Sequence, residues 1–300
     1  MRRLGLVLAF VVGALVSAQA RVNGELGERL GDGIVAALIS FASGLLLLCV
    51  VMLLGPGLRG RLGDVRRALR GRELAPWQFL GGLCGAFLIV CQGLTVATIG
   101  VAVFTVAVVG GQLLGSLWVD RTGIAPTGAT PITTLRLLGA MLAVVAVAVA
   151  GAGGWDAANG SLWLALLPAL AGGGLAFQQA VNGRIGTVGG PIAAAAVNFA
   201  VGTAALVLVA AVALMVRGAP RPPPTEPWLY LGGAFGVTLI ALGAWAVRWI
   251  GVLLLGLASV AGQLVGALIL DVVTPTGAGL SATALVGAAL TLAAVLLATR

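Results

Sequence analysis

Two glutamines inside apolar stretches are the residues of this chain best placed to do chemistry. Gln112 lies in the stretch 111–120 and Gln263 in the matching stretch 262–271, and each stretch ends in an aspartate. The glutamines are 151 residues apart (263 − 112), and so are the aspartates. An amide both donates and accepts hydrogen bonds, and a carboxylate near hydrocarbon is costly. The repeated pair therefore makes the glutamines candidates for solute binding and the aspartates candidates for coupling.

Helix packing is the open alternative for the glutamines. Both lie within a glycine-x-x-x-glycine pattern, at 111–115 and at 262–266. Small residues with this spacing let helices approach closely in a membrane, and a glutamine between them can hydrogen-bond across the interface. Substrate contact and packing both stay possible for Gln112 and Gln263.

Three charged residues are candidates for gating or coupling, namely Asp120, Asp271 and Arg248. The aspartates end their helices, and we expect one on each face of the membrane. The alternatives are that Asp120 and Asp271 are merely interfacial, or that they pair with Arg121 and a neighbouring headgroup. Arg248 lies between two tryptophans and either extends to the headgroups or stands at the mouth of a cavity.

Further amides recur at matched positions near the ends of two other apolar segments. Gln19 and Asn23 end the first of these segments, and Gln178 and Asn182 end the other, whereas Gln92 is single. A wall that is rich in amides and nearly uncharged suits a neutral or weakly charged solute. The predicted substrate-binding residues are Gln19, Asn23, Gln92, Gln112, Gln178, Asn182 and Gln263.

The composition predicts a protein with several membrane spans. Of the 300 residues 60% are hydrophobic and 9% are charged, and the mean hydropathy is +1.13, whereas soluble domains are about 25% charged. The net charge of +8 comes from arginines between apolar segments, which indicates topology and argues against a nucleic-acid partner. There is no histidine, P-loop, nucleotide fingerprint or paired carboxylate on one helix face, so we expect no enzyme, metal or cofactor.

Ten apolar segments are long enough to cross a bilayer as helices. The first resembles a signal peptide, but its polar end reappears at 178–182, so we expect it to be retained as a helix. The predicted spans are 4–22, 33–54, 77–98, 100–120, 134–153, 161–181, 190–216, 228–248, 250–270 and 280–299. We expect the segments 55–76 and 218–227 to be an arginine-rich loop and an extended connector.

The ten segments form a tandem repeat of one five-segment unit, with the first copy at residues 1–155 and the second at residues 156–300. Matched residues are shifted by 159 at Asn23 and Asn182, and by 151 at Gly100 and Gly251. Since each copy has an odd number of spans, the second copy is inverted relative to the first. The predicted fold is an all-α membrane protein of ten transmembrane helices in two inverted five-helix repeats, the architecture of secondary transporters.

The arginines also predict the orientation. Of the 17 basic residues, only Arg21, Arg29, Arg217 and Arg221 fall on the side away from the termini. Since basic residues concentrate on the cytoplasmic side, both termini are predicted to be cytoplasmic.

Three motifs together resemble the YdcZ-like branch of the drug/metabolite transporter superfamily. They are Gln-x-x-x-Asn at 19–23 and 178–182, Gly-Gly-x-x-Gly at 81–85 and 232–236, and Gly-Gln-Leu-x-Gly-x-x-x-x-Asp at 111–120. The resemblance covers nearly the whole chain as a fused tandem pair. It implies a multi-pass protein of the bacterial inner membrane whose central cavity lies among the first four helices of each repeat. Small multidrug-resistance relatives carry a glutamate on the first helix, where this chain has Gln19.

The sequence therefore predicts a secondary transporter, either an exporter or a facilitator, of an unidentified small organic solute. A non-transporting scaffold and a lipid-handling, scramblase-like protein are the alternatives. The expected partners are the solute and the lipid bilayer, and the chain is expected to be a monomer or a homodimer.

Overall fold

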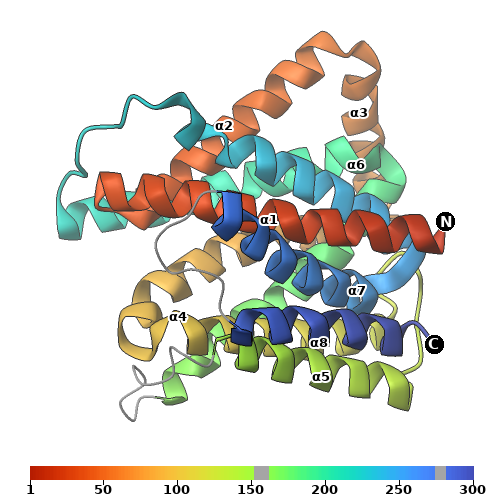
Figure 1. Ribbon diagram of the computed structural model, residues 1–300. Coiled ribbons are helices and arrows are strands. Elements are labelled where there is room, and N and C mark those ends of the chain that lie inside the picture. The colour runs from red at the N-terminus through yellow and green to blue at the C-terminus, as the bar shows by residue number, and fades with distance from the viewer. Residues whose placement is uncertain (152–161, 274–281) are drawn as a thin grey trace.

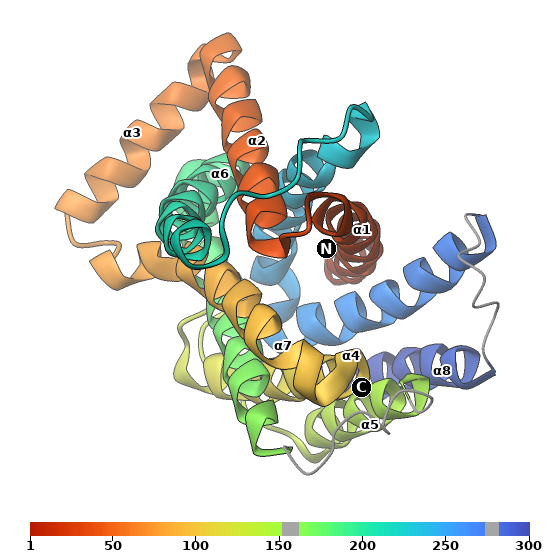
Figure 2. The ribbon, with the colours of Figure 1, turned by 90° about the vertical axis from the view of Figure 1, so that its left-hand side faces the viewer.

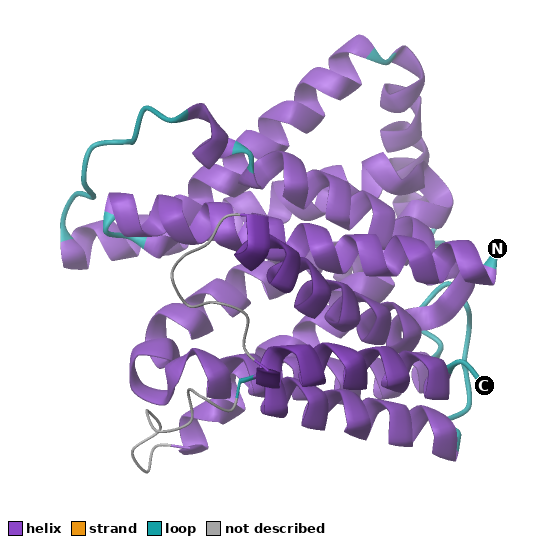
Figure 3. Cartoon of the chain, in the orientation of Figure 1, coloured by secondary structure: helices purple, strands orange, loops and turns teal. Residues whose placement is uncertain are grey.

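The computed structural model describes residues 1–151, 162–273 and 282–300, and this part of the chain is built from helices without a strand (Figures 1 and 3). The all-helical prediction is thus confirmed. The α-helices are α1 (Arg2–Leu30), α2 (Gly33–Leu54), α3 (Pro56–Arg70), α4 (Gly81–Thr122), α5 (Thr134–Ala150), α6 (Leu166–Arg217), α7 (Gly232–Val273) and α8 (Ala282–Ala298). Short 3-10 helices at Pro76–Leu80, Leu162–Ala165 and Pro227–Tyr230 lead into α4, α6 and α7.

Three of these helices are each two helical segments that meet at a single glycine. Gly100 in α4, Gly190 in α6 and Gly251 in α7 have φ values of +77°, +82° and +76°, which a side chain would strain. Every other residue of these helices keeps a helical backbone, so the chain changes direction without a loop. Gly100 and Gly251 occupy matched positions of the two repeats.

Within the described residues, six helical stretches are long and apolar enough to cross a membrane by length and composition. Two of them, 163–217 and 227–273, contain a glycine bend and cover two predicted spans each. The apolar helices α5 and α8 are shorter. Many spans are therefore evident, and the count of ten stays a prediction.

The prediction of a loop at 55–76 is wrong for most of its length. Residues 56–70 form α3, whose hydrophobic side chains Val65 and Ala68 are buried against α6 and α7 while its arginines Arg66, Arg67 and Arg70 are exposed. The many arginines of this segment suggested a loop, although they leave a narrow apolar stripe on one side of the helix. The connector 218–226, by contrast, is not helical, as its prolines predict.

The two repeats interlock through glycines, beginning with α1 and the second segment of α7. A Cβ at Gly13 would lie 1.9 Å from the carbonyl oxygen of Ser259, and a Cβ at Gly262 would lie 2.0 Å from that of Phe10. Only glycine permits two helices to approach this closely, so these positions set the distance between α1 and α7.

The pseudo-symmetric pair of helices, α4 from the first repeat and α6 from the second, makes the same contact. A Cβ at Gly172 of α6 would lie 2.0 Å from the carbonyl oxygen of Val108 in α4, and a Cβ at Gly111 would lie 1.8 Å from that of Ala169. The fourth helix of each repeat thus packs on the first helix of the other. The predicted boundary between residues 155 and 156 lies outside the described residues, and the repeats are not separate packing units.

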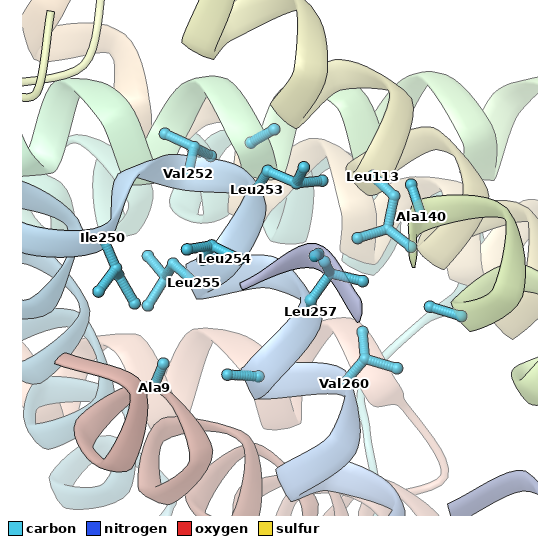
Figure 4. Packing of buried hydrophobic residues seen from close by; sticks show 14 of the residues in the cluster. Ala9, Leu113, Ala140, Ile250, Val252, Leu253, Leu254, Leu255, Leu257 and Val260 are labelled. Atoms are coloured by element: carbon cyan, nitrogen blue, oxygen red, sulfur yellow. The ribbon is translucent and has the colours of Figure 1, made fainter. Parts of the chain in front are cut away.

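The largest hydrophobic cluster surrounds the second segment of α7. Figure 4 shows this segment passing between Leu113 of α4 and Ala140 of α5 on one side and Ala9 of α1 on the other. Residues 252–255 are all buried there. The core therefore joins both repeats, and α7 holds them together.

The remaining elements define the edges and the two faces of the bundle. α5 and α8 lie side by side at one edge, and α3 projects at the opposite edge (Figures 1 and 2). The two termini lie on one face, whereas the connector 218–226 lies on the other face (Figure 1). α1, seen end-on in Figure 2, crosses the bundle between these faces.

Candidate functional site

A cavity of about 440 Å³ lies among α1, α2, α4, α6 and α7. Its lining runs from Gly27, Gly33 and Arg217, on the face of the connector, to Phe41 and Phe199 deeper in the bundle. Both repeats contribute walls. This is the position expected for the binding site of a transporter built from two repeats.

Four of the seven predicted binding residues line this cavity, namely Gln19, Asn23, Gln92 and Gln178. A fifth, Asn182, is buried behind the wall, and its Nδ2 donates a hydrogen bond of 3.2 Å to Oδ1 of the lining residue Asn198. Amides that are far apart in the sequence therefore gather in one place, because matched helices of the two repeats cross here.

Two amide oxygens of this wall, Oδ1 of Asn23 and Oε1 of Gln178, are buried and have no hydrogen-bond partner among the described residues. The side chain of Gln178 is only 6% exposed. Gln19 is anchored, because its Nε2 donates to the carbonyl oxygen of Gly232 at 2.9 Å. Since a buried polar atom without a partner is costly, the free oxygens can accept hydrogen bonds from a solute that enters the cavity.

A pair of matched phenylalanines marks the deep end of the cavity. The rings of Phe41 and Phe199 lie with their centroids 5.0 Å apart. Each ring covers a glycine of the other repeat: a Cβ at Gly44 would lie 2.3 Å from the ring of Phe199, and one at Gly202 would lie 2.5 Å from that of Phe41. The contact is reciprocal, so it lies where the pseudo-symmetric halves meet. This contact was not predicted from the sequence, although both phenylalanines stand at matched positions.

Gln112 and Gln263 do not line the cavity. Gln112 is buried within the contact of α4 with α6, where its backbone nitrogen lies 2.8 Å from the position of a Cβ at Gly172. The carbonyl oxygen of Gln263 accepts a hydrogen bond of 2.7 Å from the hydroxyl of Ser17 in α1. This placement favours the packing alternative for both glutamines.

Asp120 joins the two repeats at the bend of α7. It is 1% exposed, and its Oδ1 and Oδ2 accept hydrogen bonds from the backbone nitrogens of Val252 at 2.8 Å and Leu253 at 3.2 Å. Its carboxylate also forms a buried ion pair with Arg136 of α5. Asp120 therefore caps the second segment of α7. The alternative pairing with Arg121 is not found, because that side chain is exposed and Arg136 takes its place.

The matched residue Asp271 has different surroundings. It is part-exposed and lies 3.5 Å from Arg21 of α1, and no backbone N–H donates to it among the residues that the structure describes. The duplicated aspartates thus occupy two different states, one capping a helix and one paired near the surface.

Arg248 lies away from the amide cavity, in a second hollow of about 520 Å³ beside α3. Its guanidinium lies 4.8 Å from the ring of Trp249 and 5.8 Å from that of Trp245. Its Nε is buried and has no hydrogen-bond partner in the part of the chain that the structure describes. It therefore does not stand at the mouth of the amide cavity.

Among the described lining residues, the charge of the amide cavity comes from one residue, which was not among the predicted binding residues. Arg217, at the end of α6, stands at the mouth, and no Asp or Glu of the described chain lines the cavity. Nor do the described residues contain a group of three His, Cys, Asp or Glu side chains that could hold a metal ion. The described lining residues can therefore bind a solute through hydrogen bonds from amides, beside the single cation Arg217.

The connector 218–226 is tied across the same face. Arg29 of α1 donates a hydrogen bond to the carboxylate of Glu226, and this bond lowers the pKa of Glu226 below its ordinary value. The backbone nitrogen of Arg221 donates to the carbonyl oxygen of Leu30 at 2.9 Å. The end of α1 is thereby fixed beside the mouth of the cavity.

Comparison with known proteins decides the family. The family described as "Putative inner membrane exporter, YdcZ" matches residues 4–149 and 163–297. The chain belongs to the DMT_YdcZ family. The two matched segments follow the two repeats and fit a tandem pair.

Solved structures support the fold of this DMT_YdcZ protein. One crystal structure of a protein is similar with a TM-score of 0.66 over 99% of this chain and 96% of that chain, at 17% sequence identity. At this identity the likeness shows the fold alone. No curated protein matches the chain.

Family and fold together confirm an all-α, multi-pass membrane protein, and the family's description as a putative exporter supports a membrane transporter. The roles of the individual site residues stay predictions.

Proposed function

We propose that this DMT_YdcZ protein is a secondary transporter that moves a small, neutral or weakly charged organic solute by alternating access. The amide cavity is the binding site. The observation that carries the proposal is the pair of buried, unpartnered oxygens of Asn23 and Gln178 in a cavity shared by both repeats. A solute with hydroxyl, amide or amine donors satisfies these oxygens.

The cavity walls argue against a strongly charged substrate. A dianion would meet a single cation, Arg217, at the mouth and uncharged amides further in. A free cation would meet no carboxylate among the described lining residues. Desolvating a full charge here is costly, so hydrogen-bond donors and acceptors decide selectivity.

The two matched aspartates stabilise the two alternate conformations of the transport cycle. In this conformation Asp120 caps the second segment of α7 after Gly251, and Asp271 caps no described helix. Since the repeats are inverted, exchanging their conformations places Asp271 on the matched segment of α4, after Gly100, and releases Asp120. The caps thus alternate, and each stabilises one of the two states.

The orientation follows from the arginines. With both termini in the cytoplasm, the mouth at Gly33 and Arg217 faces the outside, so the described conformation is the outward-facing one.

Flux through reconstituted vesicles tests the proposal. A panel of neutral and zwitterionic metabolites is first screened for thermal stabilisation of the purified protein, and each hit is then followed as a radiolabelled solute. We expect saturable flux whose apparent affinity falls about 3- to 10-fold in Gln178→Ala, the effect of one lost hydrogen bond.

Gln112→Leu is the matched control, because Gln112 is a buried amide outside the cavity. It keeps the side-chain volume and is expected to leave affinity unchanged. Equal losses in both variants would contradict the assignment of the cavity. Equilibration of labelled lipid without solute flux would support the scramblase-like alternative, and the absence of both would support the scaffold.

A further inference from the structure

The second hollow, beside α3, is a separate site that the proposed transport cycle does not use. It lies between α3, the bend of α6 at Gly190 and the residues Trp245 and Arg248 of α7. Arg217, at the mouth of the amide cavity, is 27 residues further along α6 than Gly190, which is ~40 Å of helix. The two hollows therefore belong to opposite faces of the bundle.

One wall of this hollow is α3, which has no helical counterpart among the described residues of the other repeat. α3 follows the second helix of the first repeat. The corresponding connector of the second repeat, 218–226, is not helical. Because, within the described residues, the helix α3 occurs in one repeat only, the exchange of conformations between the two repeats does not account for it. The role of α3 therefore needs a separate explanation.

α3 is docked firmly over the bend. Val65 is 3% exposed, and its Cγ2 lies 2.4 Å from the position of a Cβ at Gly189. Nη1 of Arg61 lies 2.5 Å from the position of a Cβ at Gly190, the residue with positive φ. Only glycines at the bend let the helix and its guanidinium come this close.

Two arginines line the hollow, and neither has a carboxylate as an ion-pair partner among the described residues. Arg61 and Arg248 both line it, and neither forms an ion pair or a hydrogen bond among the described residues. Nε of Arg248 is buried and unpartnered, and its guanidinium lies against two indole rings. Asp64, the one acid among the described lining residues, already pairs with Arg67 of the same helix. The hollow therefore carries an excess of positive charge.

The backbone at the bend adds little to this charge. The first segment of α6 ends at Gly189 and the second begins at Pro191, and both of these helix ends line the hollow. The partial negative charge of one end offsets the partial positive charge of the other, so the excess of positive charge comes from the arginines. Guanidinium groups bind phosphate with planar, paired hydrogen bonds, and tryptophans favour the interfacial layer of the membrane.

We propose that this hollow binds a phosphate group through Arg61 and Arg248, at the face of the membrane that carries the termini. The group belongs either to an anionic phospholipid or to a free phosphate compound, since both present the same oxygens. When bound, it ties α3 to the Gly190 bend of α6.

Binding to the purified full chain tests the proposal. Thermal stability is measured in detergent with inorganic phosphate against chloride at equal ionic strength, and in nanodiscs of phosphatidylglycerol against phosphatidylcholine. We expect stabilisation by at least one phosphate source, and at least about tenfold weaker binding in Arg248→Gln, because a charge-assisted hydrogen bond is lost. Stabilisation by phosphatidylglycerol alone identifies a lipid, and stabilisation by inorganic phosphate as well identifies a free phosphate compound.

Arg66→Gln is the matched control, because Arg66 is exposed on α3 and does not line the hollow. It is expected to keep the binding, whereas Arg61→Gln, at an exposed position that tolerates change, weakens it even if Arg248→Gln does not fold. The proposal is overturned if neither phosphate source stabilises the protein, or if Arg66→Gln weakens binding as much as Arg61→Gln. The readout is binding, so the result is independent of solute transport.

Discussion

Replacing Asp120 by alanine should destabilise the protein far more than the same change at its matched residue Asp271. Asp120→Ala removes two backbone hydrogen bonds and leaves Arg136, which is 8% exposed, as a buried charge without a carboxylate. A lost helix cap costs about 0.5–2 kcal/mol. Breaking a buried ion pair on one side costs about 3–5 kcal/mol. Since the two losses overlap, we expect a total of about 3–5 kcal/mol.

Asp271→Ala removes one part-exposed pair at 3.5 Å. Such pairs contribute about 0–1 kcal/mol, so the variant should stay near wild type in stability. The duplication thus provides a control with the same chemistry at the equivalent position.

Unfolding in mixed micelles, followed by the fluorescence of the seven tryptophans, measures the difference. A double variant Asp120→Ala/Arg136→Leu should recover part of the loss, because it removes the unpaired charge as well. Equal costs at the two aspartates, or a cost below about 1 kcal/mol at Asp120, would refute the assignment of Asp120 as a buried cap.

Three other predictions follow from the packing, the connector and the proposed cycle. Gly262→Ala should destabilise the contact of α7 with α1 by about 1–3 kcal/mol, whereas Gly243→Ala, whose Cβ would meet no atom within 4 Å, should be neutral or stabilising in the same unfolding assay. The carboxylate of Glu226 has a lowered pKa because Arg29 donates to it, so its stabilisation of the connector is complete above about pH 4.3 and is lost as the pH falls further. The protection of residues 218–226 against hydrogen exchange, relative to the intrinsic rate at each pH, should fall in acid in the wild type, and in Glu226→Gln it should be lowered already at neutral pH. Asp271→Ala should slow solute flux although it barely changes stability, and unchanged flux would contradict the alternation of caps.

Hydropathy and the repeat were sufficient to predict much of this fold. Apolar runs identify the helices because a backbone in lipid must satisfy its own hydrogen bonds. Gly100 and Gly251 appear in the sequence as matched glycines between spans, and both prove to be bends. The exception is α3, whose arginines suggested a loop although its narrow apolar face is buried.

The candidate site was predicted in part. Gln19, Asn23 and Gln178 do meet in one cavity, and their recurrence at matched positions was the signal. Gln112 and Gln263 recur just as clearly, yet they lie at helix contacts away from it. Duplication preserves packing residues as well as binding residues, so recurrence alone does not separate them.

By itself, the sequence determined the helical class, the twofold repeat and the set of amides available to a solute, because these depend on local composition and spacing. The tertiary structure decided which amides share a cavity, that Asp120 rather than Asp271 caps a helix, and that α3 brings Arg61 beside Arg248. The physical reason is that these relations arise where helices of opposite repeats cross. Such crossings depend on the close approach of glycines far apart in the chain and on which side of each helix faces its neighbour.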